Sequence, residues 1–269
     1  MMGSSDFTSA VRLMMRARFA SISLWLLVAV LVTAALGAQF SGRQPATVAL
    51  DLGLSVIRIV VPVFGVLMLQ ELISREFERK LFLSTLTYPR PRHHFLLGRI
   101  AALAALMAIV LCVLAAGLAG ITAWIGQTYA QAKPVALGLP YWITIGFIIL
   151  DVWVILALGA LLAVVASTPS FVLIGALGFM LVARSFSTIV ALLQRESWLV
   201  DSAETYSGSL NLLSYVLPDL AALDVRMIAL YGQMDLLPAQ WAWHVGSAFA
   251  YCAALIALAA WALTRKRFA

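Results

Sequence analysis

Residues 141–166 read YWITIGFIILDVWVILALGALLAVVA and carry a single charged side chain, Asp151. An α-helix needs about 20 predominantly apolar residues to cross the hydrocarbon core of a bilayer, which is about 30 Å thick. A helix of this length on the surface of a water-soluble protein would need a polar face, and this stretch has none. We therefore predict that residues 141–166 cross a membrane.

Apolar stretches of this kind recur along the chain. They lie at residues 19–40, 54–74, 95–125, 141–166, 171–193 and 241–263. Hydrophobic residues make up 63% of the 269 and charged residues only 11%, whereas soluble domains carry about 25% charged residues. The sequence thus predicts an all-α, polytopic transmembrane bundle of six spans, which forms one domain over residues 1–269.

Basic residues gather before the first span, between the second and third, and after the last. They are Arg12, Arg16 and Arg18, then Arg75, Arg79, Lys80, Arg90, Arg92 and Arg99, and finally Arg265, Lys266 and Arg267. With six spans all three places lie on one side, which the positive-inside rule assigns to the cytoplasm. Both termini are therefore expected inside, in a multi-pass protein of the inner (cytoplasmic) membrane. This placement makes the lipid membrane, and not nucleic acid, the partner that explains the net charge of +6.

Three segments outside the spans have predicted structures of their own. Residues 4–18 predict an amphipathic helix in the membrane interface, because apolar residues recur at helical spacing opposite a polar face. Residues 74–88 contain no Pro or Gly and predict a cytoplasmic amphipathic helix, which Pro89 ends. Residues 194–232 form the longest outer loop, and we expect short helices there. In the helix predicted at residues 4–18, the apolar face consists of Phe7, Val11, Met14 and Met15.

Four charged residues fall within the predicted spans or at their ends, where ionisable groups are costly and often functional. Asp151 and Arg184 have similar expected depths on antiparallel neighbours, so they predict an ion pair. That pair is either a coupling or substrate pair or a structural lock between two helices. Arg58 is expected near the outer end of its span and should snorkel to the interface. Glu71, at the inner end of the same span, should reach the cytoplasmic interface.

The sequence lacks the usual catalytic motifs. There is no G-x-x-x-x-G-K-[ST] loop, so we do not expect this chain to hydrolyse nucleotide by itself, and H-E-x-x-H, C-x-x-C and G-x-S-x-G are absent as well. Cys112 and Cys252 lie in apolar spans and are expected to be buried thiols. The adjacent His93 and His94 are expected to be surface residues on a proline-flanked loop. No catalytic, cofactor or metal site is therefore expected in this chain.

Residues 71–99 resemble the signature connection of permease subunits in type-2 ABC exporters. In sequence order the matching elements are Glu71, the R-E-F-E run at 75–78, the leucine-rich stretch 81–86, Pro89 and the L-L-G-R run at 96–99. The run YVLPDL at 215–220, with Asp224 and Arg226, and the basic ending RKRF at 265–268 are similar too. One departure is the pair Arg79-Lys80, where many relatives carry Gly-Thr. The resemblance extends over the whole chain in the number and order of spans.

The resemblance implies a permease subunit of an ATP-driven exporter, which forms the translocation pathway with a second copy or a similar permease. It also implies that the helix after the second span seats in a cleft of a separate ABC ATPase subunit, which holds ATP and Mg. The residues that it assigns to coupling are Arg75, Glu76, Phe77, Glu78, Arg79 and Leu81. A solvated loop is the alternative for this segment, and a membrane-embedded enzyme or a scaffold or assembly factor are the alternatives for the protein.

Overall fold

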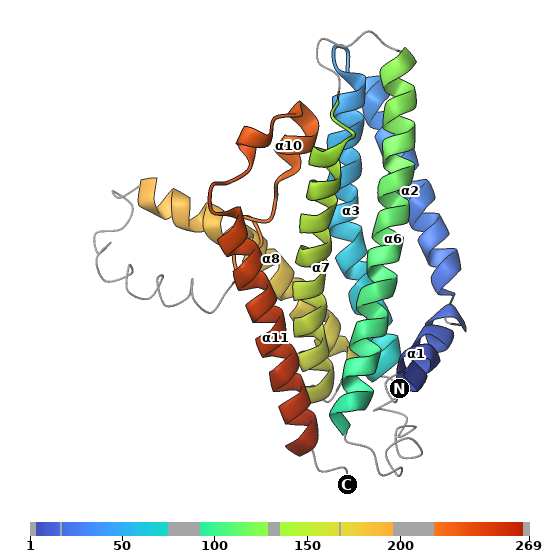
Figure 1. Ribbon diagram of the computed structural model, residues 1–269, viewed down its shortest axis with the longest axis vertical. Coiled ribbons are helices and arrows are strands. Elements are labelled where there is room, and N and C mark those ends of the chain that lie inside the picture. Colours follow the sequence, from blue (N-terminus) through green and yellow to red (C-terminus); the bar gives the residue numbers. More distant parts are fainter. Residues whose placement is uncertain are drawn as a thin grey trace.

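The computed structural model describes residues 4–16, 18–74, 92–128, 135–166, 168–195 and 218–265, and in these ranges the chain is helical and contains no strand (Figure 1). The longer helices run roughly along one axis, with α8 leaning away from the others toward its C-terminal end. The elements are α1 (Ser4–Arg16), α2 (Phe19–Phe40), α3 (Pro45–Leu69), η1 (Gln70–Ser74), α6 (Arg92–Thr128), α7 (Leu139–Val165), α8 (Pro169–Arg195), α10 (Arg226–Tyr231), η3 (Met234–Leu236) and α11 (Trp241–Arg265).

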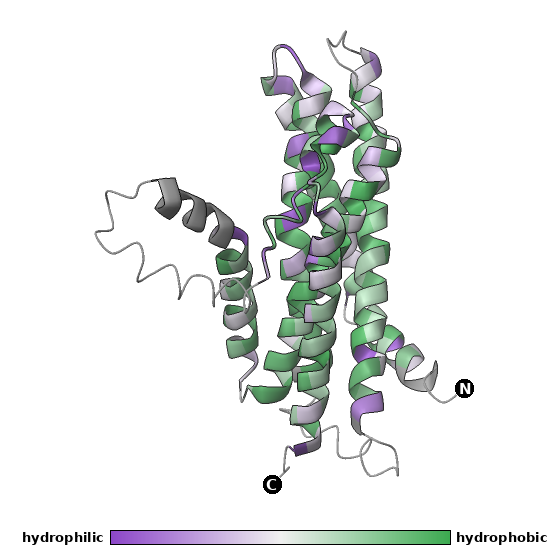
Figure 2. Cartoon of the chain, turned by 60° about the vertical axis from the view of Figure 1, so that its left-hand side comes forward, coloured by the Kyte–Doolittle hydropathy of each residue, from purple (hydrophilic) through white to green (hydrophobic). Residues whose placement is uncertain are grey.

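Within these ranges five helical stretches are long and apolar enough to cross a membrane. They are Phe19–Phe40, Pro45–Ile73, His93–Thr128, Leu139–Val165 and Trp241–Arg265. The prediction of an all-helical chain with several membrane-length helices is thereby confirmed. Figure 2 shows hydrophobic residues along most of the helix lengths, and hydrophilic ones mainly near helix ends and around α10. The remaining predicted span, residues 171–193, coincides with α8, whose apolar part among the described side chains is Pro169–Ser185.

The second span starts nine residues earlier than the sequence predicts, because α3 begins at Pro45 and not at residue 54. A proline suits the first turn of a helix, where its missing N–H is not needed. The charged residue Asp51 obscured this start in the sequence, because its charge within the bundle is paired with Arg226 and not placed in a loop. Arg58 therefore lies one residue from the midpoint of the stretch Pro45–Ile73 and is only 9% exposed. The expectation that it snorkels from the end of a span was wrong.

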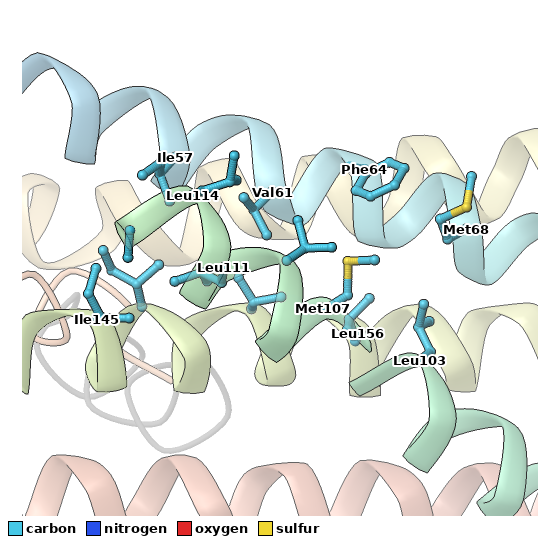
Figure 3. Packing of buried hydrophobic residues seen from close by; sticks show 14 of the residues in the cluster. Ile57, Val61, Phe64, Met68, Leu103, Met107, Leu111, Leu114, Ile145 and Leu156 are labelled. Carbon is cyan, nitrogen blue, oxygen red and sulfur yellow. The ribbon is translucent and has the colours of Figure 1, made fainter. Parts of the chain in front are cut away.

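The core forms where α3, α6 and α7 meet, as Figure 3 shows in close view. The labelled side chains are Ile57, Val61, Phe64 and Met68 from α3, Leu103, Met107, Leu111 and Leu114 from α6, and Ile145 and Leu156 from α7. In α7, 67% of the most apolar window is buried inside the protein, against 17% in α2. Thus α7 is the central helix and α2 a peripheral one, which lipid can cover.

Close approach of α3 and α6 depends on Gly53, whose absent side chain makes room for the fully buried Leu118. Small residues at such contacts let membrane helices pack tightly. We expect Gly53→Ala to destabilise the protein by about 1–3 kcal/mol, because the added methyl group overpacks the contact. The measurement is the midpoint of thermal unfolding in detergent. Gly146→Ala in α7 is the matched control, since nothing lies within 4 Å of its added carbon; equal midpoints for the two variants would contradict the prediction.

The predicted amphipathic helix at residues 4–18 is present as α1, which ends at Arg16. It packs mainly against α6, and Ala10 and Met14 are buried there with Phe7 and Val11 partly buried beside them. Met15 does not belong to this face and is 51% exposed. Successive helical residues point about 100° apart, so Met14 and Met15 cannot both face the bundle.

The connections between the helices differ in length. The join between α7 and α8 spans only residues 166–168, so these two neighbouring helices form a tight hairpin. The outer loop predicted at 194–232 contains the short helix α10, as expected, although residues 196–217 lie outside the described ranges. Residues 75–91, which hold most of the predicted cytoplasmic helix, lie outside them too.

Candidate functional site: a buried charge network

Three helices bring charged side chains together near the middle of the bundle. Arg184 of α8 forms an ion pair with Asp151 of α7 through its Nη2, which confirms the pairing predicted from their depths. The Nε atom of Arg58 in α3 lies 3.7 Å from the same carboxylate oxygen, Oδ2. The Asp151 side chain is only 1% exposed and lies one residue from the midpoint of α7. One buried carboxylate therefore faces two arginines, of which the sequence predicted one.

A proline explains why α8 is held to α3 as well as to α7. Pro62 has no N–H, so the carbonyl of Arg58 four residues earlier loses its usual helical donor. Arg184 replaces that donor, because its Nη2 donates to the Arg58 carbonyl oxygen at 2.9 Å. A single guanidinium nitrogen thus binds the carboxylate of α7 and the backbone of α3. The spacing of Arg58 and Pro62 is a sequence signal that could have pointed to this contact.

Arg58 also reaches the segment that precedes α10. Its Nη1 forms an ion pair with Asp224, and its Nη2 donates to the carbonyl oxygen of Leu220 at 2.7 Å. With Asp151 on its other side, Arg58 contacts two carboxylates and one backbone carbonyl. It is the central cation of the network, and it links α3 and α7 to residues 218–225, the segment before α10.

Arg226, the first residue of α10, extends the network toward the start of α3. Its Nε lies 2.8 Å from Asp224 Oδ1, and its Nη1 lies 3.1 Å from Asp51 Oδ1 and donates to the hydroxyl of Ser55. Burial lowers the pKa of Arg226. The hydrogen bond to Asp224 and the charges of Asp224 and Asp51 outweigh that effect and raise the pKa above its ordinary value.

The charges of this network alternate and cancel. It contains three arginines and three aspartates, which are Arg58, Arg184, Arg226, Asp51, Asp151 and Asp224. An unpaired charge inside a protein carries a desolvation penalty of several kcal/mol, which a partner offsets only with good geometry. Two buried atoms, Asp151 Oδ1 and Arg184 Nε, have no hydrogen-bond partner among the described residues. Each of the six charged side chains has at least one ionic partner within the network.

The segment before α10 lies against α3, where Arg58 donates to the Leu220 carbonyl oxygen, and α10 itself contacts both α7 and α3 (Figure 1). The apolar side chains of the segment, Leu220, Leu223 and Val225, are buried in one cluster with residues of α3, α7, α8 and α11, which also contains Ile228 of α10. Asp219 Oδ1 accepts hydrogen bonds from the backbone N–H groups of Ala221 at 3.0 Å and Ala222 at 3.2 Å. Non-helical backbone at membrane depth is tolerated where protein surrounds it and satisfies its polar groups. The network therefore supports an irregular segment inside an otherwise helical bundle.

The other predicted site residues lie elsewhere. Glu71 is half-buried in η1, 13 residues along the chain from Arg58, or roughly 20 Å at helical rise. The predicted coupling residues at 75–79 and Leu81 fall outside the described ranges. In the part of the chain that the structure covers, no group of three or more His, Cys, Asp or Glu could hold a metal ion.

The two cysteines and the two adjacent histidines can also be compared with their predicted positions. Cys252 is buried, as expected, but Cys112 is exposed, because its face of α6, with Ile109 and Val113, points away from the bundle. His93 and His94 belong to the first turn of α6 and not to a loop. An apolar helix in lipid need not bury every residue in protein, so apolar surroundings in sequence did not predict burial.

No pattern in the sequence connected Asp51, Asp224 and Arg226 to the pair of Asp151 and Arg184, because these residues lie on segments far apart in the chain.

In comparisons with known proteins, no protein-family model and no curated protein matches this chain.

Proposed function

We propose that this chain is the membrane-spanning permease subunit of an ATP-driven ABC exporter. In this proposal α8 is the fifth of six spans, both termini face the cytoplasm, and the protein resides in the inner membrane. A separate ATPase chain supplies ATP and Mg, and a second copy or a similar permease completes the pathway.

The observation that supports the proposal most is how α3 and α6 bracket the segment 75–91. α3 continues through η1 to Ser74, and α6 begins at Arg92, so 17 residues join two helices that share the main core. Arg99 of α6 also donates a hydrogen bond to the Leu72 carbonyl oxygen in η1. A partner that moves this segment would therefore move two packed helices and not a loose loop. The sequence of the segment predicts an amphipathic helix, which suits a cleft in a partner protein.

The charge network fits the same proposal. It joins α3, α7, α8 and the segment before α10, so a displacement of α3 would be transmitted to the other three. Its charges are paired, which limits the desolvation penalty of placing them inside an apolar bundle.

Copurification separates this proposal from a scaffold or a membrane-embedded enzyme, since a permease should bring down an ATPase. We expect Phe77→Ser combined with Leu81→Ser to weaken ATPase binding at least tenfold. Burying one such side chain contributes about 1.5–3 kcal/mol, and about 1.4 kcal/mol corresponds to tenfold in affinity. Membrane insertion should be unchanged, because neither residue lies in a span.

The first measurement is the affinity of the copurifying ATPase for the double variant. The second is ATP hydrolysis by the ATPase with the double variant in liposomes. Arg79→Gln is the control within the same segment, because a charge at the edge of an interface mainly changes association rate and salt dependence. If the double variant matches the parent protein in both binding and hydrolysis, residues 74–88 are not the coupling helix.

A further inference from the structure

The inner end of α3 is not an ordinary helix end. After Leu69 the helix continues directly into the π-helical turn η1, Gln70–Ser74. Single π-helical turns are rare and occur often at functional sites. Leu72 and Ile73 in this turn are each 1% exposed, and the turn contacts α1, α7 and α8 besides α3. η1 is therefore the point at which the segment 75–91 meets the packed bundle.

Arg99 holds this turn from α6. Its Nη1 donates to the carbonyl oxygen of Leu72, and its guanidinium carbon lies 4.0 Å from the centre of the Phe95 ring. An arginine near the end of a span usually extends its cation toward water. Arg99 instead points inward and is only 8% exposed, with Phe95 at 7%. Burial there carries a desolvation penalty, which the contacts of the guanidinium, among them the bond to η1, offset.

The two residues of this contact stand on either side of the segment 75–91. Leu72 precedes it by three residues, and Arg99 follows it by eight, so the hydrogen bond closes a stretch of 27 residues. Without this bond, a force on residues 75–91 could unwind η1 instead of moving α3. With it, α3 and α6 are joined at the base of the segment and must move together.

We propose that Arg99 is a positioning residue for ATPase coupling, which clamps η1 to α6 so that movement of residues 75–91 reaches both helices. This inference rests on the proposed function. It requires that the ATPase binds the segment, and it adds that the clamp transmits the movement and is not needed for binding.

The test uses Arg99→Met, which keeps the apolar stem and removes every donor, and Arg99→Lys, which keeps one cationic donor group. The readouts are the affinity of the copurifying ATPase, permease-stimulated ATP hydrolysis in liposomes, and hydrogen–deuterium exchange of residues 70–74. We expect Arg99→Met to bind the ATPase like the parent protein, to exchange faster in residues 70–74, and to lose stimulation at least about fivefold, the lower end of typical coupling between sites. Arg99→Lys should recover part of the stimulation.

Arg265→Gln is the matched control, because Arg265 also lies over an aromatic ring, that of Trp261 at 4.8 Å, but on α11. Its stimulation should equal that of the parent. The inference is overturned if Arg99→Met stimulates hydrolysis normally, or if its loss only follows a loss of folded protein in thermal unfolding. A parent protein that copurifies with no ATPase would refute the proposed function, whereas normal binding with unaltered stimulation would refute only the role of Arg99.

Discussion

Replacing Asp151 with Leu is expected to destabilise the protein by about 3–5 kcal/mol, the usual result of removing one partner from a buried ion pair. Asp151 is the carboxylate that both Arg184 and Arg58 face, and its side chain is 1% exposed. Its loss leaves Arg184 without a described ionic partner, and the network then holds three arginines against two aspartates. The measurement is the midpoint of thermal unfolding in detergent, with yield of folded protein as a second readout.

Two further variants make this prediction specific. Asp51→Asn should change stability by only about 0–1 kcal/mol, as exposed pairs usually do, because Asp51 is 48% exposed and Arg226 keeps Asp224. The double variant Asp151→Leu with Arg184→Leu should be more stable than Asp151→Leu alone, since replacing both members of a buried pair by apolar residues is often neutral. If the double variant is less stable than the single one, Arg184 does not depend on Asp151.

Replacing Arg58 with Met is expected to release residues 218–225, the segment before α10, with a loss of about 3–5 kcal/mol in stability for breaking a buried pair. The change removes the ion pair to Asp224 and leaves the Leu220 carbonyl without its donor. A hydrogen bond to a charged group contributes about 1.5–3 kcal/mol, so hydrogen–deuterium exchange in residues 218–225 should rise at least about tenfold. Asp151 keeps Arg184, so exchange in the central part of α7 should rise far less.

One control keeps the positive charge at position 58, and the other removes an arginine elsewhere. Arg58→Lys retains a cation but not the planar fork, and should give an intermediate result. Arg43→Met removes an exposed arginine next to the start of α3 and should leave exchange in residues 218–225 unchanged. Equal exchange in the parent and Arg58→Met would show that packing of Leu220 and Leu223 alone holds the segment.

The helices were predictable because they depend on local composition. A run of more than 20 apolar residues has few alternatives to a helix that crosses a membrane, since any other backbone would leave polar groups unsatisfied in lipid. The observed α2 matches its predicted bounds, 19–40, and α7 and α11 differ from theirs by two residues or fewer at each end. The prediction failed at the start of α3, where polar residues inside a helix looked like residues outside one.

Depth along a helix could also be counted from the sequence, which is why the pair of Asp151 and Arg184 was predicted. The count went wrong for Arg58 because the span was predicted to begin at residue 54, whereas α3 begins at Pro45, and the error moved Arg58 from the middle of the span to its end. Partners that approach from a non-helical segment, such as Asp224 and Arg226, could not be counted at all.

The sequence by itself determined that this protein is a bundle of membrane-length helices, because helix formation in an apolar chain depends on neighbours within a few residues. It also determined that Asp151 and Arg184 share a depth. Only the tertiary structure decided that Arg58 joins them and that the segment before α10 returns into the bundle to bring Asp224 within reach. The rotation of each helix about its axis and the path of an irregular segment depend on contacts between residues far apart in the chain, such as Arg58 with Leu220, 162 residues away. No local pattern records such contacts.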